Sequence, residues 1–253
     1  MKNKFIKIFF IFVLNLSFLQ ISHSKEFSFN APEIEVSDNG DIYKSLQRGK
    51  ITTSDQIEIN SNKSEYFTEL GNIYANKKRN DEALKSFEKA INLNSSDPLI
   101  YYYRATVYEN IKEYEKAISD YNKAIKLDPE DDTFYYFRAL VYENLEDYNK
   151  AIKDVKIAME LDPLDDDYPS HLGYLYKEIK KDYSTSLTYY LKAAELDSNE
   201  PISWLNIGVI YSEDLKDSNN ALKYFMKSIK VDSTYVKSYY RIASEYQKKI
   251  KDN

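Results

Sequence analysis

Residues 98–125 read PLIYYYRATVYENIKEYEKAISDYNKAI, and Leu127-Asp128-Pro129 follows shortly after them. The beginning of this stretch returns as Tyr135-Tyr136-Phe137-Arg138-Ala139, and its end returns as Leu161-Asp162-Pro163. Equivalent residues, such as Arg104 and Arg138, are 34 positions apart. A fixed period of this length predicts an array of stacked copies of one supersecondary unit.

Each unit has the pattern of two amphipathic helices. The residues on one face of the first helix, at i, i+3, i+4 and i+7, are Tyr101, Arg104, Ala105 and Tyr108. The second helix places Ala117, Tyr121 and Ala124 on one stripe, and the Asp128-Pro129 pair stops it. Small alanines let the two helices approach closely, and each pair keeps an apolar face that only a neighbouring unit can cover.

These units resemble the tetratricopeptide repeat from Ser64 to the C-terminus. The first unit contributes Phe67, Leu70, Gly71, Tyr74, Ala83, Phe87 and Ala90 to the family pattern, and the fifth contributes Trp204, Gly208, Tyr211, Ala221 and Phe225. The resemblance implies an all-α fold, a right-handed superhelical solenoid of helix-turn-helix repeats. The expected repeats are 64–97, 98–131, 132–165, 166–200 and 201–235, followed by a C-terminal capping helix over 236–253.

The fourth and fifth units depart from the period. The spacing from Tyr176 to Ser186, and from Tyr211 to Ala221, is one residue longer than the matching spacing in the earlier units. We expect the added residue to lie in the turn between the two helices of each unit.

The N-terminus has the three regions of a secretory signal peptide over residues 1–24. Lys2, Lys4 and Lys7 precede an apolar run, and Ser22 and Ser24 stand three residues and one residue before a cut at Lys25. We therefore expect an exported protein, periplasmic or secreted, with an uncleaved membrane anchor as the alternative. Residues 25–63 are polar and without repeats, which favours a mobile leader.

The residue inventory argues against catalysis. Cysteine is absent, and His171 is the one histidine outside the signal segment, so the usual thiol nucleophiles, zinc sets and general bases are missing. The acidic turn at Asp162 and 165–167 lacks the arrangement of an EF-hand, so helix caps are favoured over a cation site. We expect no enzyme activity, no cofactor and no metal.

The net charge limits the class of partner. Without the signal segment the chain has 32 basic residues (35 minus three lysines) and 41 acidic ones, a net charge of −9. Such a chain repels phosphate backbones, which excludes nucleic acid as a partner. The expected partner is a protein or peptide, with no membrane contact beyond the signal segment, and the oligomeric state stays open.

The family resemblance also implies where a peptide would bind, because the first helices of this family line its concave groove. A helical wheel places thirteen candidates opposite the core stripes: Tyr102, Tyr103, Thr106, Glu109, Asn110, Tyr136, Phe137, Leu140, Glu143, Asn144, His171, Tyr174 and Tyr240. The wheel puts Leu205, Val209 and Glu213 at matching places in the fifth unit. The alternative is that these rings merely pack on adjacent helices. The family's clamp for a C-terminal carboxylate is absent, because Thr68, Thr133 and Phe137 stand where it needs basic residues.

A comparison between units predicts two salt bridges. The second and third units alone combine an arginine in the first helix with an aspartate at the matching place in the second, as Arg104 with Asp120 and Arg138 with Asp154. We expect both pairs to form within their units and to be structural.

The function expected from all these features is a non-catalytic scaffold that binds a peptide or helix of an exported or envelope protein. The alternative is a structural assembly subunit that self-associates through its convex face or its end helices.

Overall fold

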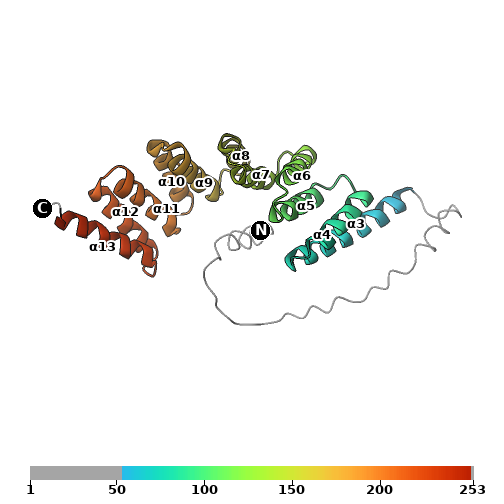
Figure 1. Cartoon of the computed structure of the whole chain (residues 1–253), viewed down its shortest axis with the longest axis horizontal. Coiled ribbons are helices and arrows are strands. Elements are labelled where there is room, and N and C mark those ends of the chain that lie inside the picture. The colour runs from blue at the N-terminus through green and yellow to red at the C-terminus, as the bar shows by residue number, and fades with distance from the viewer. Residues whose placement is uncertain (1–52, 252–253) are drawn as a thin grey trace. The chain divides into compact units, whose positions relative to one another are not determined.

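A computed structural model of the chain describes residues 53–251, and these residues form helices in an order that Figure 1 shows from cyan to red. The helices are α3 (Thr53–Asn76), α4 (Asn80–Leu93), α5 (Pro98–Asn110), α6 (Tyr114–Leu127), α7 (Asp132–Asn144), α8 (Tyr148–Leu161), α9 (Asp167–Leu175), α10 (Tyr183–Leu196), α11 (Pro201–Val209), α12 (Ser218–Val231) and α13 (Val236–Lys251). The signal peptide predicted for residues 1–24 and its alternative as an anchor lie outside the described residues.

The helices associate as consecutive antiparallel pairs. α3 packs on α4, α5 on α6, α7 on α8, α9 on α10 and α11 on α12, and the second helix of each pair also contacts the first helix of the next. α13 packs on α12 and ends the array. The all-α array of paired helices that the 34-residue period predicts is confirmed.

The first helix starts earlier than the sequence pattern suggests. α3 begins at Thr53, so residues 53–63 continue the first helix of repeat 1, whereas we expected a mobile leader up to Lys63. This segment is polar and carries no repeat signature, which is why helical periodicity did not reveal it. Residues 25–52 of the expected leader lie outside the described part of the chain.

Small residues of the first helices face rings of the second helices. Gly71 lies against Phe87, Gly173 against Tyr190, and Gly208 against Phe225. A methyl group at Gly208 would lie 2.5 Å from the Phe225 ring, so this close approach requires glycine. In repeat 2, Ala105 and Tyr121 are both fully buried. The predicted close approach of the paired helices at small residues is confirmed.

The turn between the paired helices has the same backbone in all five repeats. One residue adopts a left-handed conformation, with φ between 53° and 63°, namely Lys78, Lys112, Glu146, Lys181 and Lys216. The next residue precedes the second helix and donates its backbone N–H to a tyrosine carbonyl of the first helix. In repeat 2 this bond joins Glu113 to Tyr108 over 2.8 Å, and in repeat 3 it joins Asp147 to Tyr142 over 2.8 Å. A shared hydrogen bond thus fixes each hairpin.

The added residues of repeats 4 and 5 lie in the first helices, not in the turns as we expected. Each first helix ends in a π-helical segment, η1 (Tyr176–Lys180) after α9 and η2 (Ile210–Asp214) after α11. In these repeats the hairpin bond joins the N–H of Asp182 to the carbonyl of Tyr176, and the N–H of Asp217 to the carbonyl of Tyr211. Donor and acceptor are separated by one residue more than in repeats 1–3. A π-helical turn accommodates an extra residue while keeping the backbone hydrogen-bonded, so the turn keeps its shape.

Both predicted salt bridges are present. Arg104 Nε lies 2.7 Å from Asp120 Oδ2, and Arg138 Nε lies 2.7 Å from Asp154 Oδ2. Each arginine binds its aspartate through two nitrogens, because Nη2 donates to the other carboxylate oxygen at 2.8 Å. The arginine side chains are 21% and 16% exposed, and the aspartates are nearly buried.

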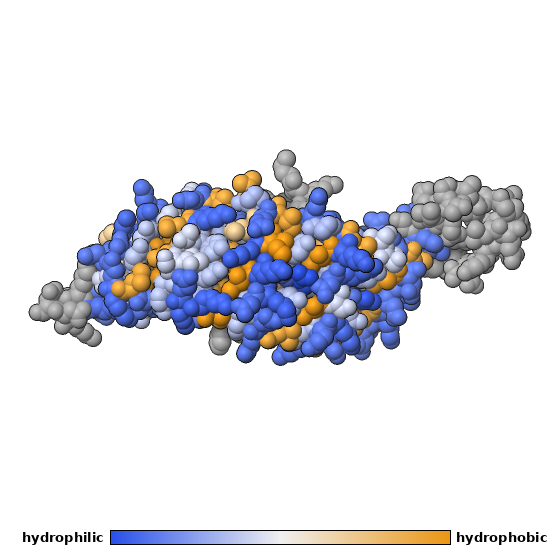
Figure 2. Space-filling model, turned by 90° about the horizontal axis from the view of Figure 1, so that it is seen from above, coloured by the Kyte–Doolittle hydropathy of each residue, from blue (hydrophilic) through white to orange (hydrophobic). Residues whose placement is uncertain are grey.

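Within the described residues, no second helix packs on α13 in the way that one covers the first helix of each repeat. Tyr239 and Tyr246 occupy the places that Trp204 of α11 and Tyr211 of η2 hold in repeat 5, and they are 49% and 48% exposed. Val236 and Tyr240 are more exposed still, at 75% and 74%. In the space-filling view of one face of the molecule, hydrophobic residues are interspersed with hydrophilic ones (Figure 2). None of the described helices is long and apolar enough to cross a membrane.

Candidate functional site

The thirteen candidate residues differ in their exposure. Tyr102 is buried, while Asn110, Asn144, Tyr174 and Tyr240 are exposed. The remaining candidates are half-buried, namely Tyr103, Thr106, Glu109, Tyr136, Phe137, Leu140, Glu143 and His171. We call the surface formed by the twelve candidates of α5, α7 and α9 the first-helix face. Tyr240 is separate from it, because it lies on α13.

Six of these residues form a continuous ladder of rings across three repeats. Its members, in order of contact, are Tyr103, Tyr102, Phe137, Tyr136, His171 and Tyr174, with ring centroids between 5.2 and 6.3 Å apart. The ladder begins on α5, crosses α7 and ends on α9 at Tyr174, whose side chain is 47% exposed. Tilted and edge-to-face pairs at these distances are favourable. The first-helix face therefore contains a continuous row of aromatic rings that hold one another in place.

One member of the ladder contradicts our expectation of a partly exposed ring. Tyr102 is only 6% exposed, because it also packs against Tyr121 of its own repeat and Phe134 of the next. A helical wheel drawn for one hairpin leaves Tyr102 off the core, but the neighbouring repeat covers it. Leu205 and Val209 are also buried, at 8% and 9% exposure, because Tyr235 and Ile242 from the next part of the array pack on their cluster. They therefore do not present a binding surface.

Two glutamates stand at equivalent places beside the ladder. Glu109 Oε2 accepts a hydrogen bond of 3.4 Å from the hydroxyl of Tyr121, and burial raises the pKa of Glu109 to about 7. Glu143 Oε1 lies 2.7 Å from His171 Nε2. This distance is that of an ion pair, and apart from it Glu143 Oε1 and His171 Nδ1 are buried atoms without a hydrogen-bond partner among the described residues.

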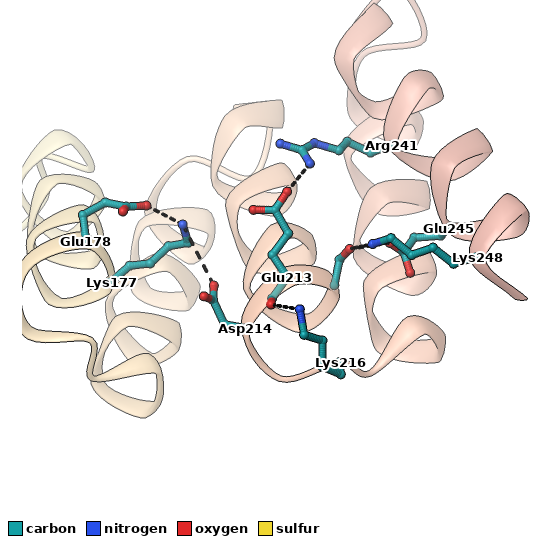
Figure 3. A network of polar contacts seen from close by, with 9 residues as sticks. Lys177, Glu178, Glu213, Asp214, Lys216, Arg241, Glu245 and Lys248 are labelled. Atoms are coloured by element: carbon teal, nitrogen blue, oxygen red, sulfur yellow. Dashed lines mark hydrogen bonds and ion pairs between the residues drawn. The ribbon is translucent and has the colours of Figure 1, made fainter. Parts of the chain in front are cut away.

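Beyond the ladder the first helices carry a network of ion pairs, which Figure 3 shows. Lys177 of η1 pairs with its neighbour Glu178 and also approaches Asp214 of η2, with 3.9 Å between Lys177 Nζ and Asp214 Oδ2. Glu213 of η2 pairs with Arg241 of α13. The two π-helical segments therefore provide four of the five charged groups. Asp214 and Arg241 are absent from our thirteen candidates. The repeat gave no signal for them, because the residues at the same places one unit earlier are Ile179 and Asn206.

A second part of the network lies under α13. Glu245 is 1% exposed and accepts a hydrogen bond from Ser212, and Lys248 Nζ lies 2.5 Å from its Oε1. The equivalent residues of α5, α7, α9 and η2 are the buried Val107, Val141, Leu175 and Ile210. A glutamate thus takes an aliphatic place, and Lys248 compensates its charge, while its Oε2 has no hydrogen-bond partner among the described residues.

The acidic turn before α9 uses its carboxylates on its own backbone. Asp162 Oδ1 accepts the N–H of Leu164 at 3.2 Å, and Asp165 Oδ1 accepts the N–H of Asp167 at 3.0 Å. No group of three or more potential metal ligands occurs within residues 53–251. Burial raises the pKa of Asp166. These carboxylates bind backbone N–H groups of the turn, but the residue that precedes α9, Asp166, makes no side-chain cap hydrogen bond, so the helix cap that we preferred is absent there.

A crevice of about 400 Å³ lies elsewhere, between α4 and α5. It is lined by Asp81, Leu84, Lys85, Glu88, Arg104 and Tyr108. Its arginine already binds Asp120, and the lining contains both signs of charge, so it offers no evident chemistry of its own. None of the thirteen candidates lines it.

Comparison with protein families agrees with the helical pairing. Models described as tetratricopeptide repeat match residues 98–131, 133–163 and 202–235, and a model described as TPR repeat matches residues 71–112. These segments belong to the tetratricopeptide repeat family. Proteins of this family generally serve as protein-binding scaffolds and are typically non-catalytic. No curated protein matches the chain.

Solved tetratricopeptide repeat structures share the fold. MamA (residues 41 to the end) from Desulfovibrio magneticus RS-1 has a TM-score of 0.59 and 19% identity, and the match covers 68% of this chain and 97% of that one. YrrB, described as a TPR protein with an unusual peptide-binding site, has a TM-score of 0.56 and 23% identity, with 74% and 95% covered. Pseudomonas aeruginosa pilF has a TM-score of 0.58 and 18% identity, with 74% and 90% covered. At these identities the likeness concerns the fold alone.

Proposed function

We propose that the first-helix face binds an extended peptide or a helix of another exported or envelope protein. The mechanism is reversible recognition without bond chemistry, and it requires no cofactor or metal. YrrB, which shares the fold, is described as having a peptide-binding site, and that supports the proposal by analogy.

The observation that carries the proposal is the aromatic ladder. It is continuous over three first helices and ends at the 47% exposed ring of Tyr174, with the exposed amides of Asn110 and Asn144 on the same face. Rings held by their neighbours offer contact area at little cost in conformational entropy, and aromatic residues are enriched among the residues that dominate binding. Exposed amides beside them would hydrogen-bond to the backbone of an extended peptide.

The test is selection of a random decapeptide display library on immobilised protein without residues 1–24. We expect enriched sequences to bind in solution, and the double variant Tyr174→Ala/Asn144→Ala to lose most of that binding while it keeps its melting temperature. Failure to enrich any peptide above the uncoated surface would contradict the proposal.

The cellular location is part of the same proposal. The charged, apolar and small-residue regions of residues 1–24 follow one another in the order of a signal peptide, which supports export. Mass spectrometry of the native protein should find an N-terminus at or near Lys25. An intact N-terminal segment would instead support the anchored alternative.

A second candidate function is self-association through the end helix. It is favoured by α13, whose Tyr239 and Tyr246 are half-exposed where other repeats cover the equivalent rings. Exposed apolar area of this kind marks interaction surfaces. Light scattering over a range of concentrations tests it: a concentration-dependent oligomer that disappears in Tyr239→Lys/Tyr246→Lys supports assembly, and a monomer at all concentrations contradicts it.

A further inference from the structure

Glu109 and Glu143 have no lysine or arginine partner, in contrast to the glutamates that occur further along the array. Further along the array, Glu178 pairs with Lys177 and Glu213 pairs with Arg241. Within residues 53–251, the recorded contacts of the two carboxylates are the Tyr121 hydroxyl for Glu109 and His171 for Glu143. Neither is in ion-pair contact with a lysine or arginine.

This arrangement is unfavourable in the free protein. Both glutamates are half-buried, and desolvated carboxylates are costly unless a cation or several hydrogen bonds compensate them. The burial of Glu109 is strong enough to raise its pKa to about 7. Glu143 Oε1 is buried, and its one recorded close polar neighbour is His171 Nε2 at 2.7 Å. Each site therefore has unused capacity to accept hydrogen bonds from a cation.

The surrounding rings favour the same kind of ligand group. Tyr103 belongs to the helix of Glu109, and Tyr136 and Phe137 belong to the helix of Glu143. The negative faces of such rings attract lysine and arginine side chains, most strongly where water is excluded. Carboxylate and ring together form a suitable acceptor for a basic side chain, the reverse of the basic clamp that the family uses for acidic peptide ends.

We propose that the first-helix face binds an extended peptide with two basic side chains about three residues apart, one at Glu109 and one at Glu143. This inference rests on the proposed function and specifies its ligand. The spacing follows from geometry: packed helices lie about 8–10 Å apart, and an extended chain advances about 3.3 Å per residue. The acidic character of the whole chain, with a formal net charge of −6, favours such a ligand as well.

The test compares selections of the random decapeptide library on three proteins. They are the wild type, the double variant Glu109→Gln/Glu143→Gln, and a control with the same change of charge at two exposed glutamates away from the face, Glu115→Gln/Glu130→Gln. Enriched peptides are then measured by titration calorimetry at pH 8, where the Glu109 carboxyl is mostly ionised. Circular dichroism establishes that all three proteins are folded at the temperature used.

We expect the wild type and the control to select peptides with Lys or Arg at positions three apart. The affinity of these peptides for the double variant should be about 100-fold lower than for the wild type, roughly tenfold for each charge-assisted bond removed. Selected peptides without this basic pair, or basic peptides that bind the double variant equally well, would overturn the inference and leave the proposed function standing. Selection of no peptide at all would overturn both.

Discussion

Arg104 binds Asp120 through two nitrogens, at 2.7 and 2.8 Å, and so links the first helix of repeat 2 to the second. The pair lies in the place that Leu172 and Tyr189 occupy in repeat 4, where both belong to one hydrophobic cluster. An ion pair and an apolar pair therefore serve the same position of the hairpin in different repeats.

The first prediction concerns the strength of this salt bridge. Asp120→Ala should lower the free energy of unfolding by about 3 kcal/mol, because it leaves a mostly buried guanidinium unpaired. Arg104→Leu/Asp120→Tyr, which copies repeat 4, should recover most of that loss. A double-mutant cycle in urea measures the coupling. The matched control is the exposed pair Lys116–Glu113, whose side chains are 58% and 49% exposed and whose coupling should not exceed about 1 kcal/mol.

The second prediction concerns the left-handed residue in each turn. Lys112 has φ of 63°, a conformation that costs a non-glycine residue about 1 kcal/mol. Lys112→Gly should therefore raise the free energy of unfolding by about 0.5 kcal/mol, the remainder being lost to the greater freedom of glycine in the unfolded chain. Lys153→Gly, at an exposed position in the interior of α8, should have the opposite effect, a loss of about 1 kcal/mol. Equal losses in both variants would contradict this account.

The third prediction concerns the π-helical segments. Deleting the exposed Lys180 should convert η1 into ordinary α-helix, because the bond from Asp182 to Tyr176 then spans the same number of residues as the one from Asp147 to Tyr142. We expect an intact fold whose stability changes by no more than about 1 kcal/mol, a small effect for an alteration outside the core. Thermal denaturation and a crystal structure of the deletion variant provide the measurement. A collapse of cooperative unfolding would show that the bulge is essential.

The added residues also show where sequence reasoning stops. The spacing between Tyr176 and Ser186 reveals an insertion, but it does not say which of the intervening residues the backbone absorbs. The period predicts the hairpins and their close contacts, because positions such as Ala105 repeat and their neighbours are fixed within one unit. Similarly, Arg104 and Asp120 were predictable because both vary together between units of one chain.

Prediction was poorer wherever contacts cross from one repeat to the next. The burial of Tyr102 depends on Phe134 of the following repeat, which a wheel for a single helix does not include. The ion pair between Lys177 and Asp214 likewise depends on two π-helical segments facing each other. Of the candidate face, the residue types and their helices could be predicted, whereas their exposure and pairing required the packed array.

The fourth prediction concerns pH. The pKa of Glu109 is raised by burial to about 7 from its ordinary value of 4.5, so between these pH values the folded protein holds a proton that the unfolded chain releases. The stability associated with this group is therefore fully present below about pH 4.5 and is lost as the pH rises through about 7. Glu109→Gln should remove this loss and make the protein more stable than the wild type at pH 8, by at most about 3 kcal/mol. Urea titrations at several pH values provide the test, with Glu115→Gln as the exposed control.

The last prediction separates binding from packing on the aromatic ladder. Tyr102→Ala should behave as a core substitution and cost about 3–5 kcal/mol of stability, because its ring contacts four others and is 6% exposed. Tyr174→Ala removes a ring that is 47% exposed, so it should leave the melting temperature nearly unchanged and weaken a library-selected peptide by about 2 kcal/mol. Tyr246→Ala, with 48% exposure on α13, is the matched control and should affect neither quantity. Binding is compared by calorimetry at a temperature where every variant is folded. If Tyr174→Ala melts as early as Tyr102→Ala, the ladder is packing throughout, and peptide recognition must be sought on another surface.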